Sequence, residues 1–343
     1  MIWGLGIIIS QKSLFLIVSF DTIKKMKPPY DLTPAILKLI TSISEKIGAV
    51  NAKLIVSQNP KLRKQNQIKT IHSSLSIEGN TLSEDQITAI VENKRVVGPE
   101  KDILEVLNAL EAYKNLKQWK SSSEKDFLKA HKMLMNKLIE VPGRYRAKGV
   151  GIVKGSKVEH LAPPASNVPF LMKELFTYLK DKSELPLIKS CVFHYEMEFI
   201  HPFMDGNGRM GRLWQTVILM ENYPLFEFLP FESLIAKNQK EYYQALSASD
   251  KEGKSTQFIE YILLLIQQSL DELLESDTKK LDGTERLEVF LEQSRDMFSR
   301  KEYMKFHKEL SSATASRDLK NGVALGLVTK SGDKKTTLYQ KKS

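Results

Sequence analysis

The chain has 343 residues, 42% hydrophobic and 27% charged, an ordinary globular composition with room for two or three cores. Cys191 is its only cysteine, which excludes a disulfide framework and a cysteine-based zinc site and indicates a reducing compartment, so we expect a cytoplasmic protein. The formal charge of +10 favours an anionic partner, but nucleotides, nucleic acid and acidic proteins would all satisfy it.

Residues 1–25 form an apolar leader of uncertain status. Ser10-Gln11-Lys12-Ser13 interrupts the apolar run, which argues against a transmembrane helix. The leader also lacks the basic start and the small-residue cleavage site of a secretory signal. We favour translation from Met26, where a pattern typical of a soluble protein opens, and we expect no membrane partner.

Helical periodicity dominates the first half of the chain. Apolar residues at helical spacing predict helices over residues 33–56, 62–76, 100–119 and 124–139. Ser83, with Gln86 three residues later, forms a capping-box pattern that predicts one more helix start. Proline and glycine then interrupt the pattern, and short β-prone runs at 151–153 and 157–160 predict a small hairpin or flap.

The helical pattern then resumes. It predicts helices over residues 167–180, 185–200, 208–222, 232–248 and 255–274. The 185–200 helix is expected to bury one stripe, made of Leu187, Ile188, Cys191, Val192, Tyr195 and Phe199. Pro202 should end this helix, because the residue before a proline is disfavoured in helical conformation. His201 would thereby lie at the mouth of a loop.

The C-terminal part has a different character. A polar stretch over 275–285 predicts a linker. Three helices are predicted over 285–295, 300–309 and 311–326, followed by a hairpin over 327–342 with a Gly-Asp turn. Helices followed by a basic ribbon are typical of a winged helix-turn-helix. Residues 300–343 hold eleven Lys or Arg against four acids, which makes this tail the best candidate for a nucleic-acid contact.

The string "HPFMDGNGRMGRLW", residues 201–214, carries the chemistry. Asp205 is a hard oxygen ligand suited to Mg²⁺, and Gly206 and Gly208 let the backbone approach an anion at a helix start. Arg209 and Arg212 lie three residues apart, on one helical face, where both could clamp phosphates. With a base at His201, the string predicts a nucleoside triphosphate site; the structural alternative is a glycine-containing loop that caps a helix.

The commoner sites with similar chemistry are absent. No GxxxxGK[ST] string occurs, which excludes a P-loop, and no HExxH occurs, which excludes that class of zinc protease. A zinc deaminase needs a PCxxC segment, which a single cysteine rules out.

The same string resembles the signature of the Fic family, HxFx(D/E)GNGRxxR, and matches it at every specified position. The segments "PPYDLTPAI", "PGRYR", "EYYQAL" and "FIEYI" resemble other parts of the family, so the resemblance spans most of the chain. It implies a mainly α fold, a Fic-type helical bundle with a small β-hairpin flap, here followed by the winged helix-turn-helix. It also implies adenylyl transfer, in which ATP gives AMP to a Ser, Thr or Tyr hydroxyl of a target protein or of the chain itself.

The resemblance assigns a role to each residue of the string. His201 would be the general base that takes the hydroxyl proton. Asp205 would hold Mg²⁺ between the α- and β-phosphates. Gly206, Asn207 and Gly208 would cradle these phosphates, with the Asn207 side chain as a donor, and Arg209 and Arg212 would bind the outer phosphates.

Three further regions carry implied roles. "SLSIEGN" resembles the inhibitory motif (S/T)xxxE(G/N), with Ser74 and Glu78 in place, so that Glu78 would pair with Arg212 and misplace the γ-phosphate of ATP. The flap around Val158–Pro163 would dock the target by strand addition. Tyr242 and Tyr243 match positions that contact adenosine, although both could equally pack in the core, and Asp250 stands where some relatives carry Asn. His72, His131 and His194 are expected to be structural.

These patterns predict a domain plan and leave two alternatives open. The expected boundaries are an N-terminal helical region over 26–123, a catalytic core over 124–275, a linker over 276–284 and a winged-helix domain over 285–343. The same site could instead mainly remove AMP, or transfer another nucleotidyl or phosphoryl group. Alternatively, the winged helix could be the working part of a transcriptional regulator that senses ATP, contacting DNA or protein.

Overall fold

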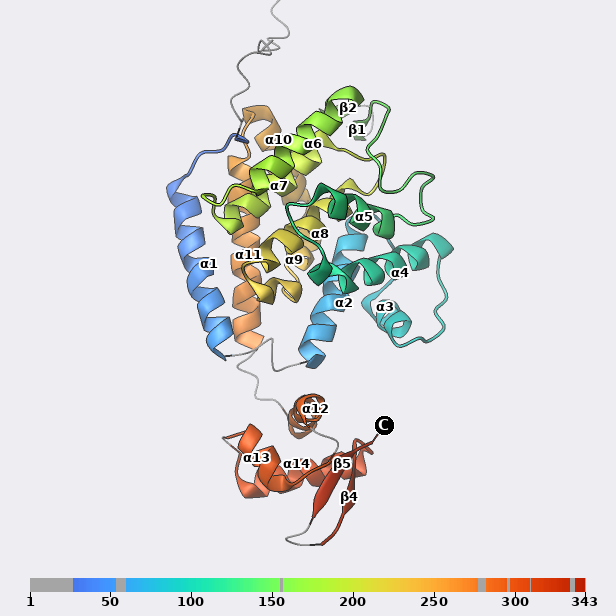
Figure 1. The fold of residues 1–343 in the computed structure, drawn as a ribbon, viewed down its shortest axis with the longest axis vertical. Helices are drawn as coiled ribbons and strands as arrows, with labels where there is room; N and C mark the ends of the chain where they lie inside the picture. The colour runs from blue at the N-terminus through green and yellow to red at the C-terminus, as the bar shows by residue number, and fades with distance from the viewer. Residues whose placement is uncertain are drawn as a thin grey trace, which may run out of the picture.

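The computed structural model describes residues 27–53, 60–154, 157–276, 282–294, 297–308, 310–333 and 337–342. The expected leader, most of the expected linker, and Lys334 and Lys335 of the expected wing lie outside these ranges. Figure 1 shows a large helical body joined to a smaller unit at the C-terminal end. Each has its own hydrophobic core.

Two helices from opposite ends of the body lie side by side. Helix α1 (Pro34–Lys53) packs along α11 (Thr256–Ser276) (Figure 1). Thr33 Oγ1 donates to Glu260 Oε1, and Lys46 pairs with Asp271. The first helix of the body is therefore held against its last helix by both packing and polar contacts.

Helices α2 (Pro60–Ser76), α3 (Glu84–Val91), α4 (Glu100–Lys114) and α5 (Glu124–Leu134) follow. The predicted capping box is present at α3, where Ser83 and Gln86 exchange side-chain-to-backbone hydrogen bonds. Helix α4 ends before residue 119, in a short 3₁₀ turn at Leu116–Gln118, and α5 ends before residue 139. Lys137 has a positive φ of 60°, which no α-helix accommodates.

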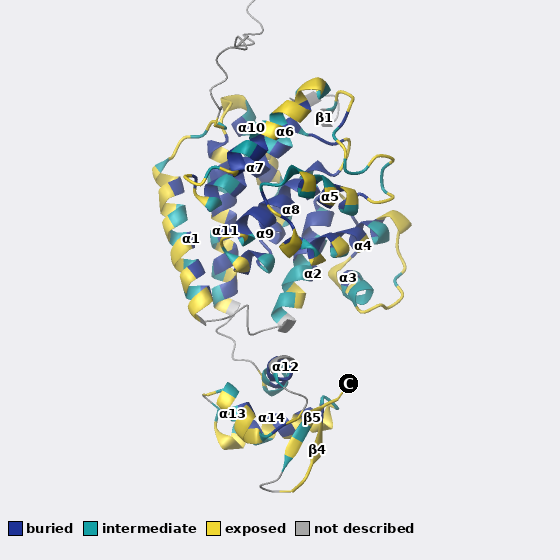
Figure 2. Cartoon of the chain, in the orientation of Figure 1, coloured by how far each residue is buried: buried dark blue, intermediate teal, exposed yellow. Residues whose placement is uncertain are grey.

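The central pair of the body is α7 (Pro186–Ile200) and α8 (Asn207–Met220), with α6 (Val168–Leu179) beside α7. Figure 2 shows both central helices mostly in the colour of buried residues. The expectation of a single buried stripe on α7 was wrong. Phe193, His194 and Met197 are buried as well, whereas Phe199 is 36% exposed, because α7 is enclosed by neighbours on nearly all sides.

The remaining elements of the body differ from the prediction at one point. Residues 232–248 were expected to form one helix, but α9 (Glu232–Lys237) and α10 (Gln239–Glu252) are separated at Asn238. The flap is confirmed, with β1 (Gly151–Lys154) antiparallel to β2 (Lys157–Leu161). Among the described residues, no helix has the length and apolar character needed to span a membrane.

The C-terminal unit has the element order of a winged helix-turn-helix. Helix α12 (Gly283–Gln293) is followed by β3 (Met297–Phe298), α13 (Arg300–Phe306), α14 (Ser312–Ala324), β4 (Val328–Ser331) and β5 (Leu338–Lys341). The three strands pair antiparallel in the order β3-β5-β4. Strand β3 was not predicted, since two residues are too few to show alternation.

Two glycines offer a test of the packing around the central helices. An alanine Cβ at Gly211, in α8, would lie 2.8 Å from His194 Cδ2, whereas at Gly48, in α1, it would meet nothing within 4 Å. We expect Gly211→Ala to lower the free energy of unfolding by about 1–3 kcal/mol through overpacking. Gly48→Ala, the matched control, should raise it by about 0.5–1 kcal/mol through helix propensity. Urea unfolding of both variants measures this, and equal effects would contradict the packing described.

Candidate active site

The loop between α7 and α8 is shaped by left-handed residues at both ends. His201 caps α7 with φ 49° and ψ 60°, and its N–H donates to Met197 O at 2.9 Å. Gly206, with φ 84°, precedes the first turn of α8, and a Cβ there would lie 2.7 Å from Met135 Sδ. Glycine at 206 is therefore required by both the backbone and the neighbour. His201 is half-buried, between the two helices.

Asn207 closes this loop from within. Its Oδ1 accepts from Phe203 N and its Nδ2 donates to Phe203 O, both at 2.9 Å. The side-chain donor that the resemblance assigns to phosphate is thus engaged by Phe203 in this structure. Asn207 thereby fixes the loop at the first turn of α8, a helix N-terminus whose backbone amides favour an anion.

Arg209 joins the loop to α4. Its Nη2 lies 3.0 Å from Asp205 Oδ1 and its Nη1 lies 3.1 Å from Glu105 Oε1. Glu105 is 6% exposed, and its Oε2 accepts from Asn80 Nδ2 at 2.8 Å. Two carboxylates, those of Asp205 and Glu105, therefore orient the Arg209 guanidinium. Glu105 also contacts Asn80, which follows closely after Glu78 in the chain.

The expected pair between Glu78 and Arg212 is present. Arg212 Nη2 lies 2.7 Å from Glu78 Oε1 and also donates to Ser74 O, while Nε donates to Ser74 Oγ at 3.0 Å. Burial lowers the pKa of Arg212, but the charge and hydrogen bond of Glu78, together with Tyr242 and Glu198, raise the pKa above its usual value. A Cβ on Gly208 would collide with Glu78 Oε1. The Glu78 carboxylate therefore lies against the first turn of α8, where a helix N-terminus favours an anion.

His131, in α5, packs against the loop and is hydrogen-bonded to it. It is fully buried and stacks on Phe203 with ring centroids 3.6 Å apart. Gly143 N donates to its Nδ1 at 2.8 Å, so the neutral ring carries its proton on Nε2, which donates to Asp205 O at 3.0 Å. Burial lowers the pKa of His131 to about 4, because charge on the ring would be poorly solvated.

This shift predicts a dependence of stability on pH. Between pH 6.5 and about 4 the unfolded chain binds a proton at His131 and the folded chain does not, so the free energy of unfolding falls as the pH drops through this window. His131→Gln keeps one donor and one acceptor but does not titrate. We expect the stability difference, wild type minus His131→Gln, to shrink from pH 7 to pH 4. Chemical unfolding at each pH measures it, and a constant difference would contradict the neutral ring.

A second buried histidine lies behind the site. His194 Nδ1 donates to Gln215 Oε1 at 2.7 Å, and its Nε2 accepts from Tyr242 Oη at 3.0 Å. Burial lowers the pKa of His194 to about 3. Tyr242 is 2% exposed, whereas its neighbour Tyr243 is 40% exposed. Of the two tyrosines predicted at the adenosine site, Tyr243 alone is open to solvent in this structure, and Asp250 accepts from Tyr195 Oη at 2.9 Å.

A divalent cation would find one carboxylate in the loop. The Asp205 side chain is half exposed, and its contacts to Gly206 N and Arg209 both use Oδ1. Within the described residues, no group of three His, Cys, Asp or Glu is arranged as a protein-only metal cage. One carboxylate fits the way Mg²⁺ is held when phosphates and water supply its other ligands.

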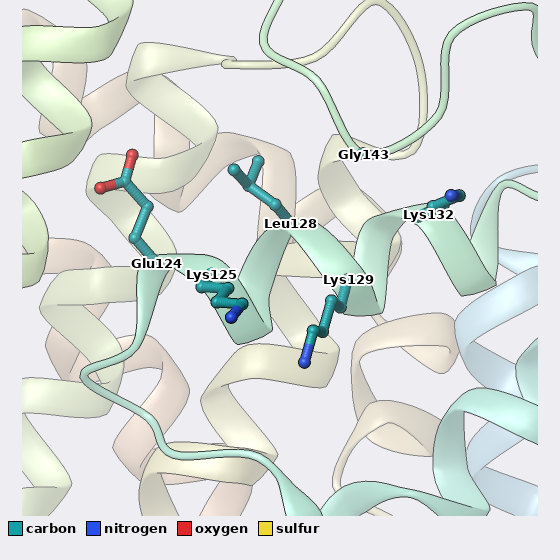
Figure 3. Close-up of a pocket in the computed structure, with 6 residues that line it drawn as sticks. All are labelled: Glu124, Lys125, Leu128, Lys129, Lys132 and Gly143. Carbon is teal, nitrogen blue, oxygen red and sulfur yellow. The ribbon is translucent and has the colours of Figure 1, made fainter.

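Two cavities are lined by residues other than those predicted at the site. One, of about 390 Å³, runs beside α5 and is lined by Glu124, Lys125, Leu128, Lys129, Lys132 and Gly143 (Figure 3). Another, of about 590 Å³, lies between α1, α10 and α11. Neither includes a predicted site residue. The loop itself can bind an anion at the start of α8, place two guanidinium groups around it and offer His201 as a base.

Comparison with known proteins decides the family. A model of the Fic/DOC family matches residues 121–219. The crystal structure of a Fic family protein from Desulfovibrio desulfuricans G20 shares 38% identity at a TM-score of 0.72, covering 93% of this chain and 99% of that one. The chain belongs to the Fic/DOC family.

Curated relatives of this Fic chain carry the name protein adenylyltransferase Fic. The one from Nematostella vectensis is 29% identical over 270 residues, which cover 74% of this chain and 60% of that protein. The one from Drosophila mojavensis is 27% identical over 245 residues, which cover 68% of this chain and 46% of that protein. The chain therefore spans only about half the length of these relatives.

Two residues that hold the site, Glu105 and Arg146, were not predicted, and a third, His131, was expected only to be structural. Glu105 and His131 lie on helices with no local motif, although a buried carboxylate on an apolar helix face is a usable signal. Arg146 is the last residue of "PGRYR", a segment that resembles the family but whose second arginine was given no role from the sequence. The structure brings all three into contact with residues 200–209.

Proposed function

We propose that this Fic protein transfers AMP from ATP to a Ser, Thr or Tyr hydroxyl of a target protein or of itself, and that Glu78 holds this activity in check. The observation that carries the proposal is the Glu78–Arg212 pair set against the first turn of α8, within an intact signature. An acidic side chain in this place occupies an anion site that the loop is built to form. The relatives' names support the reaction.

The chemistry proposed for the chain's own residues is proton transfer and positioning. His201 accepts the proton of the acceptor hydroxyl as its oxygen bonds to the α-phosphorus, and the bond to pyrophosphate breaks. The amides of the Gly206–Arg209 turn bind the phosphates, and Arg209 and Arg212 neutralise charge on the outer ones. Positioning and charge stabilisation do most of the work in such transfers.

A magnesium ion, held by Asp205, would supply charge neutralisation at the α- and β-phosphates. The half-exposed carboxylate supports this assignment. Arg209, which contacts the same carboxylate, would keep it oriented toward the nucleotide.

The acceptor is proposed to dock by strand addition along the flap around Val158–Pro163. Tyr243, and Tyr242 beneath it, would face the adenosine. The alternative reaction at the same site is removal of AMP from a modified protein. In that reaction Glu78 would take part in the chemistry instead of inhibiting it. A cytoplasmic location is part of the proposal, supported by a single, buried cysteine.

A second candidate function belongs to the winged-helix unit. Asp318, the only acid of α14, is 3% exposed and pairs with Arg286 at 2.8 Å, so it does not offset the exposed Arg317 and Lys320 on the same helix. We propose that α14 and the basic ribbon contact DNA. Fluorescence titration with a short duplex tests this: affinity should fall steeply with salt and fall further in Arg317→Ala, but not in Lys240→Ala of the helical body. Salt-independent or absent binding would contradict it.

The proposed reaction can be tested on the purified chain. Wild type and Glu78→Gly are incubated with ATP and Mg²⁺, and their intact masses are measured. We expect Glu78→Gly to gain mass in steps of one AMP. Gain of single phosphoryl groups would contradict adenylyl transfer and favour a kinase-like reaction.

A further inference from the structure

A buried arginine links the flap to the histidine loop. Arg146 is 3% exposed, and all of its described side-chain hydrogen bonds go to backbone carbonyls. Its Nε donates to His201 O at 2.8 Å and its Nη2 to Ile200 O at 3.3 Å. These are carbonyls at the C-terminal end of α7, which have no partner within the helix and favour a cation.

The same guanidinium closes the base of the flap. Nη2 also donates to Pro163 O at 2.6 Å, and Nη1 to Lys148 O at 2.9 Å. Pro163 stands two residues after β2, and Lys148 three residues before β1. The chain segments that lead into and out of the hairpin are therefore both hydrogen-bonded to the Arg146 side chain. The same side chain also binds the carbonyl of His201.

The backbone around Arg146 is fixed from the other side as well. Arg146 N donates to Pro202 O at 2.9 Å, and Gly143 N donates to the buried His131. His201 has a left-handed backbone, a conformation that non-glycine residues adopt only where their surroundings impose it. The Arg146 contacts on either side of His201 supply that constraint.

We propose that Arg146 is a positioning residue that couples the flap to His201. Its guanidinium would hold the acceptor segment bound on β1–β2 and the base that deprotonates it in a fixed relative position. This inference rests on the proposed function. Arg146 does not touch the nucleotide loop beyond Pro202, so its role is confined to the acceptor side of the reaction. Lysine cannot replace it, because one ammonium cannot span carbonyls from three segments.

The test uses the full chain carrying Glu78→Gly, with Arg146→Lys or Arg146→Gln added, and Arg144→Lys as the matched control. Arg144 lies on the same loop and is exposed. Two quantities are measured without any turnover: hydrogen exchange at residues 151–163 and 199–204, and ATP affinity by calorimetry. The third is the rate of self-modification from α-labelled ATP.

We expect Arg146→Lys to speed hydrogen exchange at both segments together and to leave ATP affinity within about twofold. The transfer rate should fall by about tenfold to a hundredfold, as for other small misplacements of a catalytic group. Arg144→Lys should match the parent in all three.

Three results would overturn the proposal: faster exchange at only one of the two segments, an ATP affinity that falls in step with the rate, or faster exchange throughout the helical body in both Arg146 variants. The last would make Arg146 a requirement of the whole fold. If the Glu78→Gly parent transfers no label, the proposed function fails, whereas the exchange measurement still decides whether Arg146 couples the two segments.

Discussion

His201→Ala, made in the Glu78→Gly chain, is expected to lower the rate of AMP transfer by about 10²- to 10⁴-fold, the contribution typical of a positioned general base. The physical reason is the location of the side chain. His201 ends α7 in a left-handed conformation, and only residues 202–206 separate it along the chain from the first turn of α8, where the phosphates are proposed to bind. It is the one histidine of the 201–214 string, and removing it leaves the phosphate-binding groups in place.

The measurement is the initial rate of label transfer from α-labelled ATP, with ATP affinity determined alongside. Affinity should stay close to that of the parent, because the amides of α8, Arg209 and Arg212 are untouched. His307→Ala, in the C-terminal unit, is the control for loss of an imidazole elsewhere. An unchanged rate in His201→Ala would remove the histidine from the mechanism.

Glu78→Gly alone is expected to raise the transfer rate over wild type by about 5- to 150-fold, the range of ordinary regulatory coupling free energies. Arg212 is 1% exposed at its side chain and is held by Glu78 and Ser74 together. Freed from the carboxylate, its guanidinium can turn to a phosphate without leaving its buried position. Glu78→Gln should activate less, since the amide still fills the space against Gly208.

The control for this variant is Glu92→Gln, which removes a surface carboxylate paired with Lys64 and Lys94. It should leave the rate unchanged. A Glu78→Gly chain that is slower than wild type would mean that Glu78 takes part in the reaction, as removal of AMP would require. Equal rates would mean that the ion pair does not limit activity.

Local patterns predicted most of the helices because each depends on neighbours in sequence. The capping box at Ser83 and the flap strands are confirmed at nearly the expected residues. The errors arose where tertiary packing overrides local preference. Helix α7 is buried on nearly every side, and the break at Asn238, whose carbonyl accepts a hydrogen bond from Tyr261 Oη, divides a segment that was predicted as one helix.

The residues of the site likewise fall into those that local patterns predicted and those that depend on tertiary contacts. The loop residues and the Glu78–Arg212 pair were predicted through a contiguous motif and a family resemblance. Glu105 and Arg146 could not be assigned, because each acts through contacts separated by more than fifty residues in the chain. The task of Asn207 within the loop depends on a hydrogen-bond geometry that spacing does not encode.

The most direct test of the central claim uses ATP labelled separately at the α- and γ-phosphates, with Mg²⁺ and a lysate of the source cell. Wild type, Glu78→Gly and Glu78→Gly/His201→Ala are compared for label on protein. The account predicts α-label without γ-label, stronger in Glu78→Gly than in wild type and lost in the double variant. Label from γ alone, or none from either position in Glu78→Gly, would contradict adenylyl transfer restrained by Glu78.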